Sequence, residues 1–147
     1  MKRNQRILAI AFLATLGLLS GCFRLDSNLY NPVDTITAYL GDAYPETDDW
    51  DVVPDSSFRL ADSMVHLFTL GSQAPGETTP TTIHALYLGD ESRIATDTVI
   101  LYCHGNYGHM DVYWQRAKIL ANLGGKHRFG VLMMDYRGFG LSEGTAT

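Results

Sequence analysis

The chain has 147 residues, a length that fits one domain at most. Hydrophobic residues make up 46% of it, enough apolar surface for a folded core, so a chain disordered throughout is excluded. The formal net charge of −5 argues against nucleic acid as a partner.

Residues 1–21 read as a leader peptide. Basic residues at positions 2, 3 and 6 precede an apolar run over residues 7–19, which is short for a membrane span. The Leu-Ser-Gly sequence before Cys22 then resembles a bacterial lipobox. This resemblance implies cleavage before Cys22 and a diacylglycerol on its thiol, which would anchor the mature chain to a membrane. The alternative is an uncleaved signal anchor with an incidental cysteine.

The residue after the cysteine bears on location. By resemblance to Gram-negative lipoproteins, Phe23 in place of aspartate favours the outer membrane, facing the periplasm. We therefore expect a lipoprotein of the cell envelope, although the sequence does not name the type of organism. The second cysteine, Cys103, is then left without a disulfide partner, and we expect it to be a buried strand residue. Its apolar surroundings disfavour the alternative, a reactive nucleophile.

Residues 22–57 form an acidic stretch punctuated by proline. Loss of the leader peptide removes three positive charges and brings the net charge from −5 to −8. Such a stretch after a lipidated cysteine is typical of a solvated tether. Tyr39, Tyr44 and Trp50 indicate that parts of it lie against the domain or the lipid headgroups. Three aspartates at 48, 49 and 51 lack the glycine and closing glutamate of a calcium loop.

Residues 58–147 have the pattern of an α/β domain. Two lead-in strands, predicted at Met64–Leu70 and Thr81–Leu88, are expected to pair antiparallel. A strand at Thr98–Cys103, buried on both faces, is followed by a helix from Asp111, its N-cap, to Leu123, and by a buried strand at Phe129–Met134. Strand, helix and strand of this length predict a right-handed βαβ unit in a parallel sheet.

A glycine-containing loop follows each of the two parallel strands. The first is His104-Gly105-Asn106-Tyr107-Gly108, and the second runs from Asp135 to Gly144. The carboxyl ends of parallel strands meet at one edge of a sheet, where ligands bind. The first loop lacks the G-x-G-x-x-G spacing of a dinucleotide site, which leaves that alternative weak.

The two loops read H-G-N-x-G and D-Y-R-G-F-G-x-S-x-G, and together they resemble the α/β-hydrolase superfamily. The resemblance is greatest to serine hydrolases described as esterases, lysophospholipases or S33-type peptidases, and covers residues 65 to 147. It implies that the chain holds the N-terminal part of an α/β-hydrolase sheet. It also implies that His104 and Gly105 form the oxyanion loop, and that the backbone N–H of Asn106 stabilises the developing negative oxygen.

The second loop also contains a deceptive pattern. Residues 140–144 spell G-x-S-x-G, the sequence of a nucleophile elbow. The elbow serine sits directly between a buried strand and a helix, whereas Ser142 lies within a glycine-rich loop and no histidine follows it. We therefore interpret Ser142 as a loop residue, with the nucleophile as the alternative. The resemblance implies a pocket loop that includes Gly138, Gly140 and Ser142, with Asp135 and Arg137 holding its backbone.

No metal or cofactor is expected. His104, His109 and Asp111 lie close in sequence, but their spacing matches no standard ligand set. His104 is expected to orient the oxyanion loop through hydrogen bonds.

The sequence thus predicts the N-terminal portion of a membrane-anchored serine hydrolase. The nucleophile, the triad acid and the catalytic histidine would lie beyond Thr147, so we expect the 147 residues alone to be inactive. Substrates would be small-molecule esters, lipids or peptides, and the second partner would be the membrane, through lipidated Cys22. The alternative is a non-catalytic module, a lipid-anchored binding protein or a truncated remnant.

Overall fold

The computed structural model describes residues 29–33, 35–45, 56–125 and 128–146. The predicted leader peptide, the lipidated Cys22 and the acidic residues 46–55 lie outside the described residues. Within the described ranges, no helix has the length and apolar character needed to cross a membrane.

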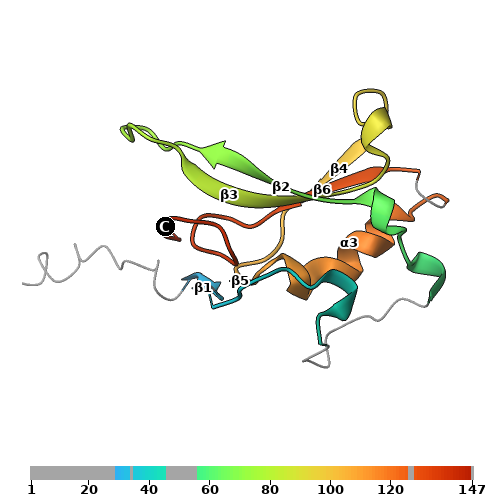
Figure 1. The fold of residues 1–147 in the computed structure, drawn as a ribbon, viewed down its shortest axis with the longest axis horizontal. Coiled ribbons are helices and arrows are strands. Elements are labelled where there is room, and N and C mark those ends of the chain that lie inside the picture. Colours follow the sequence, from blue (N-terminus) through green and yellow to red (C-terminus); the bar gives the residue numbers. More distant parts are fainter. Residues whose placement is uncertain (1–28, 34, 46–55, 126–127, 147) are drawn as a thin grey trace, which may run out of the picture.

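The domain contains a mixed four-stranded sheet with the order β2-β3-β6-β4 (Figure 1). The strands are β2 (Val65–Ser72), β3 (Thr81–Leu88), β4 (Val99–Tyr102) and β6 (Gly130–Met134). β2 pairs antiparallel with β3, β3 pairs antiparallel with β6, and β4 runs parallel to β6. The predicted antiparallel lead-in pair and the parallel βαβ unit are both confirmed, with strand ends shifted by one or two residues in three of the four cases.

The helix of the βαβ unit is shorter than predicted. A 3-10 turn at Met110–Tyr113 leads into α3, which spans Trp114–Ala121. The prediction of Asp111 as the N-cap is wrong, because Asp111 lies inside the 3-10 turn. Its carboxylate instead accepts hydrogen bonds from the backbone N–H groups of Leu40 and Gly41, at 2.8 and 2.9 Å. The Asp111 carboxylate therefore binds backbone groups far away in the sequence and does not cap the helix that follows it.

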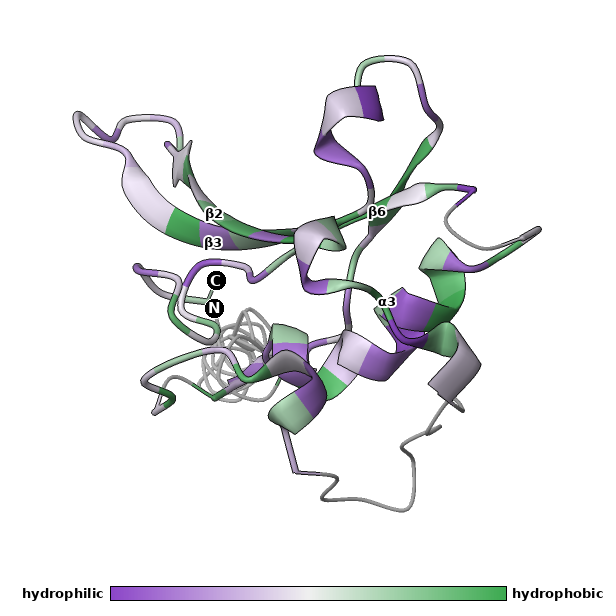
Figure 2. Ribbon diagram, turned by 45° about the vertical axis from the view of Figure 1, so that its right-hand side comes forward, coloured by the Kyte–Doolittle hydropathy of each residue, from purple (hydrophilic) through white to green (hydrophobic). Residues whose placement is uncertain are grey.

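α3 covers one face of the sheet and forms the core with it (Figures 1 and 2). Alternate residues of β3 and β6 face the helix, because successive side chains of a strand point to opposite faces. Burying each large apolar side chain contributes about 1.5–3 kcal/mol to stability. The buried sheet and helix residues are Leu86, Leu88, Val131, Met133, Trp114, Ala117 and Ala121.

β4 is an edge strand, which contradicts the prediction of a strand buried on both faces. Among the described residues it pairs with β6 alone, and Leu101 is 56% exposed. Cys103, expected to be buried, is exposed just beyond the end of β4. Composition predicted a strand here, but the burial of a strand depends on its neighbours, which composition does not specify.

Part of the predicted tether packs on the domain. β1 (Asn31–Pro32) runs parallel to β5 (Tyr107–Gly108), a short strand inside the first glycine loop. Asp42 accepts a hydrogen bond from the indole N–H of Trp114 at 2.7 Å and pairs with Lys118. The expected contact of Tyr39 and Tyr44 with the domain is confirmed, and residues 29–33 and 35–45 do not form a tether free of it. The boundaries of the leader, the tether and the domain stay predictions.

Candidate functional site

The two glycine loops lie together at the carboxyl ends of β4 and β6. Parallel pairing places Tyr102 of β4 beside Met133 of β6, so the chain leaves both strands at the same edge of the sheet. The first loop then reaches β5 and α3, and the second turns back toward β3. The expectation that both loops share one edge is therefore met.

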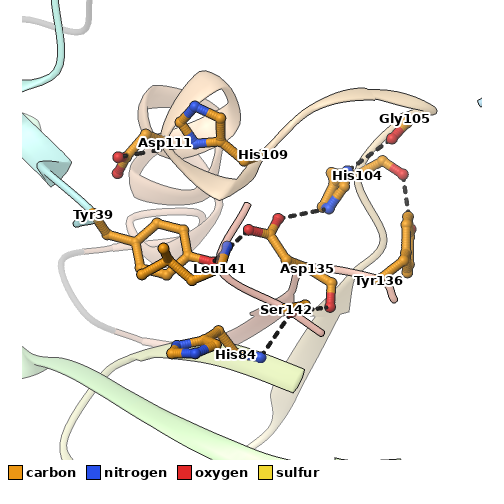
Figure 3. A network of polar contacts seen from close by, with 10 residues as sticks. All are labelled: Tyr39, His84, His104, Gly105, His109, Asp111, Asp135, Tyr136, Leu141 and Ser142. Atoms are coloured by element: carbon orange, nitrogen blue, oxygen red, sulfur yellow. Dashed lines mark hydrogen bonds and ion pairs between the residues drawn. The ribbon is translucent and has the colours of Figure 1, made fainter. Parts of the chain in front are cut away.

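A buried histidine and a buried aspartate lie in contact where the two loops meet (Figure 3). His104 Nε2 lies 3.0 Å from Asp135 Oδ1, and neither side chain is exposed to solvent. His104 Nδ1 lies 2.7 Å from the carbonyl oxygen of Gly105, so each ring nitrogen faces an oxygen. The ring also stacks on Tyr113 and contacts Tyr136, with ring centroids 5.1 and 4.5 Å apart. These contacts leave the imidazole a single orientation.

That orientation fixes the peptide group between Gly105 and Asn106. A trans peptide is planar, and its C=O and N–H point in opposite directions. Because the Gly105 oxygen is held against His104, the N–H of Asn106 points away from the ring. Within the part of the chain that the structure describes, this N–H has no hydrogen-bond acceptor. The following peptide is held too, since the Asn106 oxygen accepts from Asn31 N at 2.8 Å.

The other oxygen of Asp135 binds a residue from the predicted tether. The Tyr39 hydroxyl donates to Asp135 Oδ2 at 2.6 Å and accepts a hydrogen bond from Leu141 N at 3.1 Å. Burial and the neighbouring Asp135 carboxylate raise the pKa of Tyr39 far above its ordinary value. The hydroxyl therefore keeps its proton and remains a donor to Asp135.

Gly140 leaves room for this arrangement. Its φ of +56° is in the left-handed region, and a Cβ there would lie 2.0 Å from Asp135 Oδ2 and 2.7 Å from the Tyr39 oxygen. Its N–H donates to the carbonyl of Val33 at 2.9 Å. Only glycine satisfies both the backbone conformation and the close approach.

Ser142 links the second loop to β3 through hydrogen bonds. Its hydroxyl donates to the Asp135 carbonyl at 3.0 Å and accepts from His84 N at 2.9 Å. The side chain is buried, and its one proton is already donated to a backbone carbonyl. This geometry is that of a loop residue, as interpreted from the sequence, and differs from an exposed elbow nucleophile.

Arg137 binds Glu77 and not, as expected, the backbone of its own loop. The resemblance implied that Asp135 and Arg137 hold the backbone of their own loop, but both side chains bind elsewhere. The guanidinium of Arg137 makes hydrogen bonds of 2.6 and 2.7 Å to the two carboxylate oxygens of Glu77, and one of 2.6 Å to the carbonyl of Ser72. It lowers the pKa of Glu77 to about 2. Arg137 thus ties the second loop to the β2–β3 hairpin, while Gly138 N bonds Glu143 O within the loop.

A cavity of about 470 Å³ lies beside the second loop. Its walls are mainly aromatic and aliphatic, and its one charged group is the paired Arg137. The lining residues are Tyr30, Ser72, Ile83, Met134, Tyr136, Arg137, Phe139, Thr145 and Ala146. A cavity of this size and character suits an uncharged organic group.

A second histidine and aspartate lie buried near the first pair. His109 Nδ1 is 3.9 Å from Asp111 Oδ2, and the His109 ring contacts Tyr39 and Tyr44. Burial lowers the pKa of His109, although the carboxylates of Asp111 and Asp135 oppose this shift. Burial raises the pKa of Asp111. Among the described residues, no group of three His, Cys, Asp or Glu side chains is placed to hold a metal ion.

This burial predicts how stability depends on pH. The folded pKa of His109 is below the unfolded value of 6.5, so the unfolded state binds its proton more readily. The stability that neutral His109 contributes is therefore complete above the unfolded pKa and is lost as pH falls toward the folded pKa. We expect the free energy of unfolding to decrease between about pH 7.5 and pH 5.5, and to decrease less in the His109→Gln protein. Urea unfolding at each pH measures both slopes.

The contribution of Asp111 to stability changes with pH in the direction opposite to that of His109. Its raised pKa adds stability that is present at low pH and is lost as pH rises through the folded value. For this reason the unfolding of the unsubstituted and His109→Gln proteins is compared only above the pH range in which carboxyl groups ordinarily titrate. A pH slope that His109→Gln leaves unchanged contradicts the prediction.

Sequence reasoning missed several residues of this site. Tyr39 was expected only to lie against the domain or the lipid headgroups, and Glu77 was not singled out, yet each binds a predicted site residue. Gly138, Gly140 and Ser142 of the second loop were singled out through their pattern. No local pattern in the sequence links Tyr39 to Asp135, because 96 positions separate them.

Comparisons with known proteins do not assign a family. No protein-family model matches the chain, and no solved structure matches it. A stretch of 55 residues is 42% identical to the uncharacterized protein YfhR of Escherichia coli strain K12, and the O157:H7 protein of the same name matches equally. The stretch covers 37% of this chain and 17% of each YfhR chain. The match therefore spans less than a fifth of those relatives, and their description states no function.

Proposed function

We propose that this chain is the N-terminal portion of a membrane-anchored serine hydrolase of the α/β-hydrolase type. The reaction is acyl transfer from an ester, thioester or amide to water, through a covalent acyl-serine. The observation that carries the proposal is the fixed peptide of Gly105 and Asn106. Its carbonyl oxygen lies 2.7 Å from His104 Nδ1, and its N–H has no acceptor among the described residues.

A preorganised N–H of this kind is what acyl transfer requires. The carbonyl oxygen of the substrate gains negative charge when the nucleophile attacks, and a fixed donor stabilises that charge without reorganising. One such donor contributes about 3 kcal/mol to the stabilisation of the transition state. In this proposal the Asn106 N–H is that donor, and His104 and Gly105 hold it in place.

The open edge of β4 supports the location of the nucleophile. Among the described residues β4 pairs on one side only, and the exposed Leu101 lies on this edge strand. A further parallel strand paired with β4 would end at the same edge of the sheet as the Asn106 loop. A serine at the end of that strand would lie beside the Asn106 N–H. The proposal places this serine and its acid and histidine partners beyond Thr147.

The cavity and the leader peptide support the substrate class. The cavity beside the second loop is lined mainly by aromatic and aliphatic side chains, which favours an uncharged ester or acyl group over a charged one. The lipobox-like sequence before Cys22 would hold the enzyme at a membrane, where lipid esters are abundant. No cofactor takes part in the proposed reaction.

The test is ester hydrolysis by the complete gene product. We expect hydrolysis of p-nitrophenyl butyrate, and we expect a fluorophosphonate, which reacts with activated serines, to abolish it. The Ser142→Ala protein removes the alternative nucleophile and should still react with the fluorophosphonate. If the folded, complete product neither hydrolyses esters nor reacts with the fluorophosphonate, the proposal fails and the non-catalytic alternative is preferred.

A further inference from the structure

The N-terminal segment places one side chain inside the buried network of the two loops (Figure 3). Tyr39 lies between the second loop and α3, where its ring contacts His84 and His109, with centroids 5.8 and 6.3 Å apart. Its hydroxyl donates to Asp135 and accepts from Leu141 N. The two residues that follow Tyr39 donate their N–H groups to the Asp111 carboxylate, which fixes the backbone directly after the ring.

The contacts form a continuous path from Tyr39 to the oxyanion peptide. Tyr39 holds Oδ2 of Asp135, and Oδ1 of the same carboxylate lies against His104 Nε2. The other nitrogen of His104 lies against the Gly105 oxygen, which belongs to the same planar peptide as the Asn106 N–H. The His104 ring therefore packs between the Asp135 carboxylate and the Gly105 oxygen, so a movement of the carboxylate would disturb the ring and the peptide that carries this N–H.

Tyr39 is the one side chain in the described ranges that donates a hydrogen bond to Oδ2 of Asp135. Without it, Oδ2 would lose its donor in a site where neither Asp135 nor His104 has any exposed side-chain surface. A carboxylate in such a place must find another donor or rotate, because an unsatisfied buried charge is costly.

We propose that Tyr39 is a positioning residue for the oxyanion peptide of Gly105 and Asn106, acting through Asp135 and His104. This inference rests on the proposed hydrolase function. It makes the segment that follows the lipid anchor part of the catalytic unit. The raised pKa of Tyr39 fits this role, because burial and the Asp135 carboxylate keep the hydroxyl protonated.

The first test compares Tyr39→Phe with the unsubstituted complete gene product. Steady-state hydrolysis of p-nitrophenyl butyrate is measured, and the concentration of competent sites is determined by titration with a fluorophosphonate. We expect kcat per titrated site to fall about ten-fold while KM stays within about two-fold, because an oxyanion donor acts mainly in the transition state. The control is Tyr87→Phe, which removes the hydroxyl of a buried tyrosine that lies outside the core cluster of α3.

A purely structural role for Tyr39 gives a different result. The melting temperature would fall, but kcat per titrated site would equal that of the unsubstituted protein, and this outcome overturns the inference. If the unsubstituted protein shows no hydrolysis and no labelling, the proposed function itself fails and the inference falls with it. The two failures are therefore distinguishable.

A second measurement does not depend on the folding of a variant. 3-Fluorotyrosine incorporated at position 39 keeps the hydroxyl and reports on it by fluorine NMR. Phosphonylation of the nucleophile places a phosphonate oxygen in the oxyanion site, and we expect the position-39 resonance to shift. A resonance that does not move when the labelling is complete overturns the inference.

Discussion

Replacement of Asp135 by alanine is expected to lower the free energy of unfolding by about 3–5 kcal/mol. Asp135 is fully buried, and its carboxylate holds His104 on one side and Tyr39 on the other. Removing it leaves the buried His104 imidazole and the partly buried Tyr39 hydroxyl without their partner. Urea unfolding of the complete gene product, followed by circular dichroism, measures the change.

The matched control for this substitution is Asp97→Ala. Asp97 also forms an ion pair, with Arg93 at 2.9 Å, but the Arg93 side chain is 58% exposed. The Asp97 side chain is 16% exposed, so solvent reaches both partners. Such a pair contributes about 0–1 kcal/mol, so the control should be close to the unsubstituted protein. If Asp135→Ala costs no more than Asp97→Ala, the buried network does not hold the two loops together.

Replacement of Gly140 by alanine is expected to destabilise the folded protein by more than about 3 kcal/mol. The added methyl group would lie 2.0 Å from Asp135 Oδ2, and it would occupy a left-handed backbone conformation at φ +56°. Asp135 would have to move, and its contacts with Tyr39 and His104 would be lost. Thermal and urea unfolding measure the effect, and ester hydrolysis should fall with it.

Gly76→Ala separates backbone strain from the steric clash. Gly76 has a φ of +90°, but nothing lies within 4 Å of a Cβ built there. Its substitution should therefore cost only the strain, about 1–2 kcal/mol. Equal effects of the two substitutions would mean that the space around Gly140 plays no part, which contradicts the close approach to Asp135.

The sequence was sufficient to predict the strands and the loops for physical reasons. Apolar and β-branched runs bounded by glycine or polar residues define β3, β4 and β6, because such runs bury well in a sheet. The glycines of the two loops mark positions where the backbone needs unusual angles. These are local properties, and a single sequence carries them. The order and length of these runs predicted the lead-in pair and the parallel unit, but not the antiparallel pairing of β3 with β6 that joins them.

The parts that were missed depend on contacts between distant residues. Asp111 has the chemistry of an N-cap, but two N–H groups from the N-terminal segment bind it instead. Cys103 follows an apolar run, but its exposure depends on which strand lies next to β4. Arg137 and Glu77 are 60 positions apart, and no local pattern pairs them. The sequence states the chemistry of each side chain, but it does not state which distant residue that side chain will contact.

The acidic composition of the N-terminal segment was similarly misleading. Net negative charge and proline are typical of solvated tethers, yet Tyr39 and Asp42 anchor this segment to buried groups of the domain. The hydrogen bonds of these two side chains hold the segment on the domain, although its composition is acidic and contains proline.

The most direct test of the account is to identify the residue that a fluorophosphonate modifies in the complete gene product. Proteolysis and mass spectrometry of the labelled protein locate the modified side chain. The account predicts one labelled serine beyond Thr147 and no label on Ser142, whose hydroxyl is committed to the Asp135 carbonyl. A label on Ser142 would contradict the interpretation of the second loop, and a folded protein without any label would contradict the hydrolase proposal.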